Sequence, residues 1–396
     1  MSLTEIPVKG ITKGVMMSAH RATGDRIITL PFMLLLTVFA ISIYFMIQRF
    51  AFGGMGAVSN LNGGFAWGIW VVYDVVIGTA FACGGYALAI TVYLLNKGRY
   101  HPLMRPAILT SLLGYALGGF GAFFDMGRFW QFYEIFLPWN WNFNSVMLEV
   151  GLCVAAYIII LTIEFAPAFL ERIGAKGLLK VLNKVLFLFI ALGILLPTMH
   201  QSSLGSLLIA MGHKVDPLWQ TDHFQPLLAI LTALIMGFSI VVFEASLTTA
   251  GLGQPSEKPL LSGLGRIIMW LLVGFVIIRM GVLVFQNKLD LIFAGSFSSL
   301  IFMIEMALFI LPIILLASSR ARQNSGLLLI AAVSMLFAGA AYRFDAFLIT
   351  FNPGPGYTYF PSFPEIMITL GVISFELMAY LIFVKKLPIL HRAEFA

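Results

Sequence analysis

Charged residues are scarce in this sequence. Asp, Glu, Lys and Arg make up 11% of its 396 residues, while hydrophobic residues make up 60%. Soluble globular chains carry about 25% charged residues, so the composition excludes an ordinary soluble protein. Apolar runs of about 18 or more residues recur along the chain, and each can cross a hydrocarbon core about 30 Å thick. We therefore expect an all-α polytopic membrane protein that contacts membrane lipid and binds no nucleic acid.

Cysteine is nearly absent. The two cysteines, Cys83 and Cys153, lie far apart inside apolar segments, and no Cys-x-x-Cys motif occurs. Iron–sulfur clusters are held by sets of cysteine thiolates at characteristic spacings. The sequence therefore predicts that this chain holds no iron–sulfur cluster, and a structural disulfide is not expected.

Histidine is also rare, which bears on haem. Haem b needs axial ligands, usually histidines that face one another across a helix bundle. Only His200 and His223 fall near the predicted spans, both toward one edge, and no span contains two histidines. We therefore expect neither haem nor another metal site. The six histidines are His20, His101, His200, His213, His223 and His391.

Long hydrophilic segments are missing too, and the hydrophobic runs between charged or Gly/Pro-rich breaks predict ten spans. The longest connections are about 20 residues, too short for a soluble catalytic domain. The first run lacks the cleavage site of a signal peptide and is too long for one, so we expect it to remain as a helix. The predicted spans lie near residues 27–50, 67–95, 104–124, 145–169, 178–199, 224–248, 265–286, 296–317, 325–348 and 364–384.

The basic residues indicate an orientation. An even number of spans places both termini on one side. Eighteen of the 24 Lys and Arg residues lie on that side, in the termini and in the loops near 96–105, 171–184, 249–266 and 318–324. Because cytoplasmic loops carry the excess of Lys and Arg, we expect both termini to be cytoplasmic. The remaining six (24 − 18) are Arg49, Arg128, Lys214, Arg279, Lys288 and Arg343.

Tryptophan is concentrated on the opposite, outer side. Two interpretations stay open: a one-sided aromatic belt at the lipid headgroups, or a platform that receives a partner or ligand. The outer connections 126–144 and 351–364 are also the longer ones. The outer tryptophans are Trp67, Trp70, Trp130, Trp139, Trp141 and Trp219.

Ionisable residues within the spans are numerous, although burying them in a membrane is costly and usually functional. A passive membrane anchor does not need so many. For Glu244, Glu305 and Glu376, an interhelical ion pair or a protonated carboxyl is an equally good interpretation. The set comprises Asp74, Asp125, Glu149, Glu164, Glu244, Arg279, Glu305, Arg343, Asp345 and Glu376.

Several polar and aromatic residues of spans 2 to 5 fall at one predicted depth near the outer face. Together they offer hydrogen-bond donors, an aromatic slot and titratable groups, which suit a quinone. Tyr115 near mid-membrane and Glu164 near the inner end extend a polar line inward. Glu149 and Glu164 are about 22 Å apart along their helix. The outer group comprises Trp67, Trp70, Asp74, Asp125, Arg128, Glu149 and His200.

Six strings resemble a known family. They closely resemble the membrane subunit of hydrogenase-2-type NiFe hydrogenases, which belongs to the NrfD/PsrC (polysulfide reductase membrane subunit) family. The resemblance covers nearly the whole chain after the first span. The strings are LNGGFAWGIWVVYDVVIGTAFACGGYALA (61–89), YHPLMRPA (100–107), DMGRFW (125–130), EFAPAFLERIG (164–174), LPTMHQSSLGSLL (196–208) and FNPGPGYTYFP (351–361).

The resemblance implies an architecture and a set of partners. It implies one membrane domain with two four-helix bundles, at 67–199 and 224–348, and peripheral helices at 27–50 and 364–384. It implies a bacterial inner-membrane location, and a site for menaquinone or ubiquinone near the periplasmic face of the first bundle. The partners would be a periplasmic ferredoxin-like iron–sulfur subunit and the small and large subunits of the NiFe hydrogenase.

The resemblance also implies roles for particular residues. Tyr115, Glu149 and His200 match the positions associated with quinone-coupled proton transfer, and Glu164 and Arg105 match further family positions on a proton path. With the outer group, these predict quinone contacts from Trp67, Trp70, Asp74, Asp125, Arg128 and Asn142.

Other functions remain as alternatives. The same family serves complexes that handle sulfur compounds or multihaem cytochromes. A secondary transporter would also suit ten spans with buried charges, but transporters usually have helices broken at mid-membrane. Here the polar residues are expected at the outer face, and the prolines of spans 2 to 5 lie near their ends.

Overall fold

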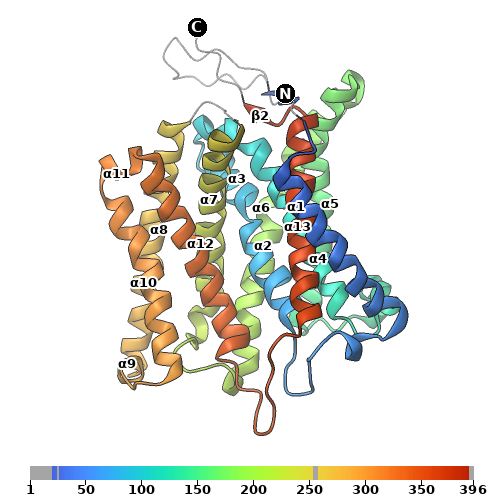
Figure 1. Cartoon of the computed structure of the whole chain (residues 1–396). Helices are drawn as coiled ribbons and strands as arrows, with labels where there is room; N and C mark the ends of the chain where they lie inside the picture. Colours follow the sequence, from blue (N-terminus) through green and yellow to red (C-terminus); the bar gives the residue numbers. More distant parts are fainter. Residues whose placement is uncertain (1–19, 25, 253–256, 392–396) are drawn as a thin grey trace.

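The fold was analysed in a computed structural model that describes residues 20–24, 26–252 and 257–391. Ten helical segments in these ranges are long and apolar enough to cross a membrane, which confirms the predicted all-α polytopic class. They run roughly parallel in Figure 1. The segments are Leu30–Phe52, Trp70–Leu94, Gly98–Asp125, Val146–Ile173, Lys176–Lys214, Asp222–Gly251, Lys258–Phe285, Phe297–Ala317, Ser325–Ile349 and Phe363–Lys386.

Both ends of the described chain lie at the same end of the molecule. The short strand β1 (His20–Arg21) pairs antiparallel with β2 (Leu390–His391). Close by, Lys385 Nζ donates to the Arg26 carbonyl at 2.5 Å. We call this the inner end, after the predicted side of the basic loops, and the opposite one the outer end.

Four spans pack together as a first group, and four as a second. The first consists of the second span with α4 (Met104–Asp125), α5 (Val146–Ile173) and α6 (Lys176–Met211). The second contains α7, α8, α10 and α12, and lies beside the first (Figure 1). The groups meet where α7 packs on α6 and α3. The bounds of the second group are α7 (Gln225–Leu252), α8 (Lys258–Phe285), α10 (Phe297–Ala317) and α12 (Ser325–Phe344).

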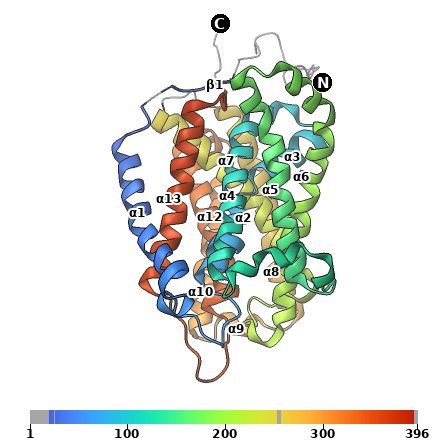
Figure 2. The ribbon, with the colours of Figure 1, turned by 90° about the vertical axis from the view of Figure 1, so that its right-hand side faces the viewer.

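The first and last spans are neighbours. Helix α1 (Leu30–Ile47) packs along α13 (Phe363–Lys386), and α13 packs on α4 (Figure 2). A Cβ added to Gly371 of α13 would overlap the Ser42 hydroxyl of α1, so glycine permits this close approach. The sequence suggests peripheral helices at the two ends of the chain; the structure places both on the same flank of the first group.

The second span is not one continuous α-helix. It is interrupted at Ala82 and Cys83, near mid-span, and is π-helical toward both ends. Glycine on the neighbouring α7 allows this geometry, because a Cβ at Gly237 would lie 2.4 Å from the Cys83 carbonyl oxygen. The span has no proline in its middle, so the positions of the prolines do not predict this break. Its segments are η3 (Trp70–Ile77), α2 (Gly78–Phe81), α3 (Gly84–Ala89) and η4 (Ile90–Leu94).

Helix α6 extends well beyond the predicted span 178–199. It continues to Met211 because the serines that follow His200 bond within the helix: Ser203 Oγ donates to the Met199 carbonyl at 2.9 Å. Gly205 also lets the backbone at Gln225 approach, since a Cβ there would lie 2.6 Å from the Gln225 carbonyl oxygen. The prediction that His200 lies at the outer edge was therefore wrong. Eleven residues separate it from the end of α6, or about 16 Å.

Short segments complete the chain. Five of them lie in the connections, and the other five, η1, η5, η8, η9 and η10, extend membrane-spanning helices. They are η1 (Gln48–Phe52), η2 (Met55–Ala57), η5 (Gly98–Leu103), η6 (Phe129–Phe136), η7 (Pro138–Asn140), η8 (Gly212–Lys214), η9 (Asp222–Phe224), α9 (Leu289–Ile292), α11 (Ser319–Gln323) and η10 (Asp345–Ile349).

Candidate functional site

A polar cluster is buried at mid-depth in the first group of helices. His200 and Tyr115 are both buried, and their ring centroids are 5.7 Å apart. His200 Nε2 lies 3.1 Å from Thr79 Oγ1, and Gln201 Nε2 donates to the same hydroxyl at 3.3 Å. The predicted pair of Tyr115 and His200 is thus brought together by α4 and α6, with Thr79 from the second span. Tyr115 lies near mid-span as expected, and His200 lies deeper than the sequence suggested.

The break in the second span contributes to the same cluster. Cys83 Sγ donates to the Thr79 carbonyl at 3.2 Å and lies 3.6 Å from the Tyr115 hydroxyl. On the other side of Tyr115, the Tyr157 ring of α5 packs edge-on, with centroids 4.5 Å apart. Neither Cys83 nor Tyr157 was predicted as a site residue, because only the tertiary contacts place them beside Tyr115.

One buried cation adjoins the cluster from the second group of helices. Arg343 of α12 donates to Gln201 Oε1 at 2.9 Å, to the Val76 carbonyl at 3.2 Å and to the Ala229 carbonyl at 3.0 Å. A small cavity of about 10 Å³ lies beside it. We define the central cluster as Thr79, Cys83, Tyr115, His200, Gln201 and Arg343.

The central cluster has an unsatisfied polar atom. In the part of the chain that the structure describes, His200 Nδ1 is buried and has no hydrogen-bond partner. A buried polar atom without a partner costs about 1–3 kcal/mol. Such an atom in a mid-membrane cluster is a position where a polar ligand or a proton acceptor adds a hydrogen bond.

Glu164 and Glu149 lie on opposite sides of this cluster along α5. Glu164 packs against α6, where a Cβ at Gly193 would overlap its carboxyl, and it interacts electrostatically with Tyr157. Glu149 is exposed in the first turn of α5, eight residues before Tyr157 and so about 12 Å nearer the outer end. The predicted inner-to-outer order of Glu164, Tyr115 and Glu149 is retained. The structure shows no contact of Glu149 with Tyr115 or His200 among the described residues.

A second acidic group lies nearer the outer end. Asp125 Oδ2 accepts from the Gly68 backbone N–H at 3.2 Å, and Asp74 is buried against Gly121 of α4. The buried Glu365, at the start of α13, accepts hydrogen bonds from the Tyr359 hydroxyl at 2.7 Å. Burial, together with this hydrogen bond, raises the pKa of Tyr359 above its ordinary value.

The two predicted quinone-contacting tryptophans are packing residues in this structure. Trp67 is buried and donates to the Phe347 carbonyl at 2.7 Å. Trp70 is also buried, and it donates to the Glu365 carbonyl at 3.2 Å. Both indole N–H groups are therefore satisfied, and neither ring forms an open slot. The quinone contacts of Trp67 and Trp70 stay predictions.

Arg128 and Asn142 are exposed on the outer surface. The Asn142 side chain accepts from the Asn144 backbone N–H at 3.1 Å, which is a local turn contact. The same connection exposes large aromatic side chains, including Trp130 at 60% and Trp139 at 78%. We define the aromatic surface as Trp130, Phe132, Tyr133, Phe136, Trp139 and Phe143, all of which are exposed.

Arg105 lies at the inner end, far from the aromatic surface. It forms an ion pair with Glu171 of α5, with Nη1–Oε2 and Nη2–Oε1 distances of 2.8 and 2.6 Å, and it donates to the Pro388 carbonyl at 3.1 Å. These contacts tie α4, α5 and the end of the chain together.

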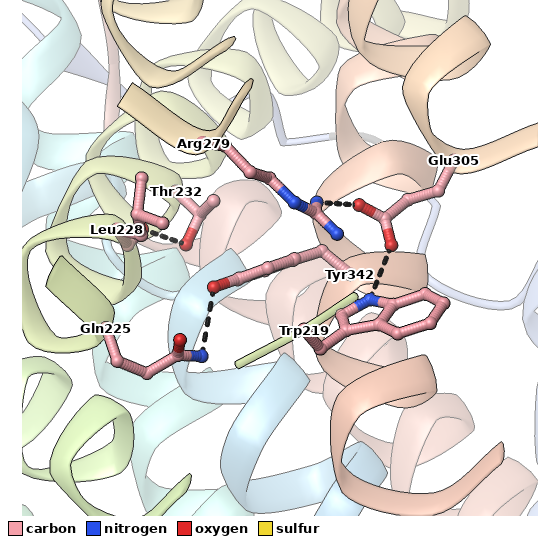
Figure 3. A network of polar contacts seen from close by, with 7 residues as sticks. All are labelled: Trp219, Gln225, Leu228, Thr232, Arg279, Glu305 and Tyr342. Atoms are coloured by element: carbon pink, nitrogen blue, oxygen red, sulfur yellow. Dashed lines mark hydrogen bonds and ion pairs between the residues drawn. The ribbon is translucent and has the colours of Figure 1, made fainter. Parts of the chain in front are cut away.

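The second group of helices contains a separate buried network (Figure 3). Arg279 of α8 forms a fully buried ion pair with Glu305 of α10. The Trp219 indole donates to the same carboxylate at 2.8 Å, and the Tyr342 ring packs 4.7 Å from the guanidinium carbon. Gln225 Nε2, which borders an outer pocket of about 300 Å³, donates to the Tyr342 hydroxyl at 3.3 Å.

The histidines do not fit a haem site. The His200 ring is enclosed by Thr79 and Tyr115. His101 lies in η5 at the inner end of its span, and His213 and His223 lie in η8 and η9 at the outer end. No second histidine side chain of the described residues therefore faces His200 across the bundle, as two axial ligands would require.

Ten apolar helices that enclose buried titratable groups define a polytopic membrane protein. Residues 57–350 match the family described as Polysulphide reductase, NrfD, and the chain belongs to this family. The matched region includes the whole central cluster but not α13.

Similar proteins of known source support this assignment. The chain is 48% identical over 369 residues to the Probable Ni/Fe-hydrogenase 2 b-type cytochrome subunit of Escherichia coli, covering 93% of this chain and 94% of that one. It is 31% identical over 353 residues to a Nitratidesulfovibrio vulgaris protein, covering 85% and 89%. It is 28% identical over 163 residues to the Menaquinone reductase, integral membrane subunit, of the same organism, covering 39% and 37%.

Proposed function

We propose that this chain is the quinone-reactive membrane subunit of a respiratory NiFe hydrogenase. The observation that carries the proposal is the central cluster, in which His200 Nδ1 is buried without a partner, the His200 ring packs against Tyr115, and Arg343 donates to the neighbouring Gln201. The similarity to a hydrogenase 2 subunit and to a menaquinone reductase subunit supports the partner and the substrate class.

The residues of the cluster suit the chemistry of a quinone. Reduction delivers two electrons and two protons to the two quinone oxygens. His200 and Tyr115 supply hydrogen-bonding and proton-transferring groups, and Arg343 places a fixed positive charge near the oxygen where negative charge develops. Menaquinone and ubiquinone share these two oxygens, and either is compatible with the cluster.

Protons would reach the cluster from the inner end. Glu164 lies inward of the cluster on α5, and Tyr157 of the same helix packs edge-on against Tyr115, so we assign Glu164, Tyr157 and Tyr115 to a proton path toward His200. Glu149, at the outer start of α5, would be the outermost member of this quinone-coupled path. Arg105 holds the inner end of α4 through Glu171.

Electrons would arrive from an iron–sulfur subunit on the outer face. The aromatic surface is exposed there, beside the start of α5, and Arg128 and Asn142 border it. Aromatic side chains are enriched at protein interfaces. We propose that the chain lies in the inner membrane of a bacterium with both termini in the cytoplasm. Its proposed partners are a ferredoxin-like iron–sulfur subunit and the small and large subunits of the hydrogenase.

The test compares two histidine variants in the intact membrane complex. We expect His200→Ala to lower hydrogen-dependent quinone reduction about 100-fold or more, the effect of removing a proton-transferring group. Hydrogen oxidation with an artificial dye should be unchanged, because the dye bypasses the membrane subunit. His213→Ala is the matched control, since His213 lies in η8 at the outer end.

Quinone reduction at the unsubstituted rate in His200→Ala would refute the proposed site. A second outcome separates the partner from the site. If the complex takes no electrons from hydrogen but passes electrons from quinol to a sulfur compound or a multihaem cytochrome, the hydrogenase partner is wrong and the quinone site is supported.

A further inference from the structure

A buried carboxyl outside the central cluster links three helices near the inner end. Glu244 of α7 accepts a hydrogen bond from Thr110 of α4 at 2.8 Å. Its other oxygen accepts one from the Tyr380 hydroxyl of α13. The carboxyl thus lies where α4, α7 and α13 meet, and no step of the proposed quinone chemistry uses it.

Two further carboxyls follow along the same face of α4. A Cβ at Gly114 would lie 3.4 Å from Glu376 Oε1 of α13, and a Cβ at Gly121 would lie 2.7 Å from Asp74 Oδ2. Positions 110, 114 and 121 share one face, because four and seven residues are close to one and two helical turns. The glycines leave room on this face for the two carboxyls.

The inner end of this line opens to a cavity. The cavity has a volume of about 40 Å³ and is lined by Pro106 and Ala107 of α4, by Glu244 and by Glu257. Burial raises the pKa of Glu257 to about 7. A carboxyl with this pKa both takes up and releases protons near neutral pH.

The outer end of the line is an unsatisfied carboxyl. Asp74 is only 5% exposed, and within the described ranges its Oδ2 has no hydrogen-bond partner. The rise along α4 from Gly114 to Gly121 is about 10 Å. Hydrogen-bonded water between Glu376 and Asp74 would complete the line.

We propose that Glu244, Glu376 and Asp74 form a second proton line along α4, which starts at the inner-end cavity, passes the level of the central cluster at Glu376 and ends at Asp74 nearer the outer end. Each proton that enters at Glu244 releases one from Glu376 toward Asp74, so the charge of the line is restored after every transfer. The inference rests on the proposed function, in which the quinone is the final acceptor. The line depends on α13, which lies outside the matched family region.

The first test measures proton uptake by the whole complex in proteoliposomes. A pH dye is enclosed on the side of the inner end, and hydrogen and quinone are supplied. If the two lines deliver one proton each, Glu376→Gln and Glu244→Gln should lower inner-side uptake per quinone by about half. Glu376→Asp keeps a carboxyl and should restore it.

The second test is infrared spectroscopy of the same complexes. In the unsubstituted protein, the C=O stretch of the protonated Glu376 carboxyl should shift when water is replaced by D₂O, and Glu376→Gln should lack this band. A line that is open to the inner cavity exchanges its proton; a carboxyl that only packs between helices keeps it. The band is assigned to Glu376 by its loss in Glu376→Gln or by its displacement in Glu376→Asp, and its exchange is measured in the unsubstituted protein.

Unchanged inner-side uptake in both Gln variants, or a carboxyl band that does not shift in D₂O, would overturn the second proton line. Failure of the proposed function looks different: the unsubstituted complex would then not reduce quinone, while the infrared exchange would still report on the carboxyls.

Discussion

At the scale of single residues, the buried ion pair of the second group of helices has a clear energetic consequence. Arg279 and Glu305 are both fully buried, and the guanidinium also lies 4.8 Å from the Phe302 ring centroid. Charges are costly to bury, and the cost is offset only while each retains its partner. The pair therefore fixes how α8 and α10 pack.

We expect Glu305→Leu to lower the stability of the protein by about 3–5 kcal/mol, because it leaves Arg279 buried without a counter-charge. Thermal unfolding in detergent measures the effect. The double variant Arg279→Met with Glu305→Leu is the control, since it removes both charges, and it should recover most of the loss. Equal stability of the single and double variants would show that the ion pair does not have this role.

At the scale of elements, the break in the second span depends on its neighbours. Gly237 lies against the Cys83 carbonyl, and Ser111 Oγ of α4 accepts from the Gly85 backbone N–H at 2.9 Å. The break brings the Cys83 side chain to Tyr115. Packing by α7 and α4 thus helps to place the central cluster.

We expect Gly237→Ala to destabilise the protein by about 1–3 kcal/mol, because an added methyl group overlaps the Cys83 backbone. Gly274→Ala in α8 is the matched control: its Cβ would meet no atom within 4 Å, and alanine favours a helix. Thermal unfolding of both variants, with quinone reduction as a second readout, checks this. A Gly237→Ala protein as stable as Gly274→Ala would contradict the proposed contact.

The ten spans could be predicted from the sequence because each depends mainly on its own hydrophobic run. The end of α6 could not be predicted, because the serines at 202, 203 and 206 are typical of a loop. In the structure their hydroxyls bond to backbone carbonyls within the helix. The break at Cys83 could not be predicted either, because it depends on Gly237, which is about 150 residues away in the chain.

The site was only partly predictable for the same reason. Tyr115 and His200 were identified, but Thr79, Cys83 and Gln201 carry no signal until tertiary contacts place them beside that pair. The sequence suggests an aromatic slot that includes Trp67 and Trp70, and in the fold both indoles are buried. The depth of His200 in the membrane could not be predicted from the end of its hydrophobic run, because α6 continues to Met211.

At the scale of the whole molecule, the proposed function separates charge across the membrane. Hydrogen is oxidised outside, and protons reach the quinone from the inner end. Each elementary charge moved through 100 mV costs about 2.3 kcal/mol. We expect an opposing membrane potential to slow hydrogen-dependent quinone reduction in proteoliposomes, and an uncoupler to restore the rate.

A potential-sensitive dye and pH dyes on both sides provide the measurement. Proton uptake only from the outer side, with no potential formed, would mean that neither Glu164 nor the carboxyls along α4 conduct protons from the inner end.

The pairing of α1 with α13 constrains how the chain is made. Ribosomes add about 5–20 residues per second, so roughly 15 to 60 s pass between synthesis of the first span and that of its partner. During this interval α1 must lie in lipid without its neighbour. Its surface suits that state, since Leu30, Leu34 and Tyr44 remain exposed even in the finished fold. The contacts of α13 with the α4 face, including the Glu376 carboxyl beside Gly114, form only when the last helix inserts.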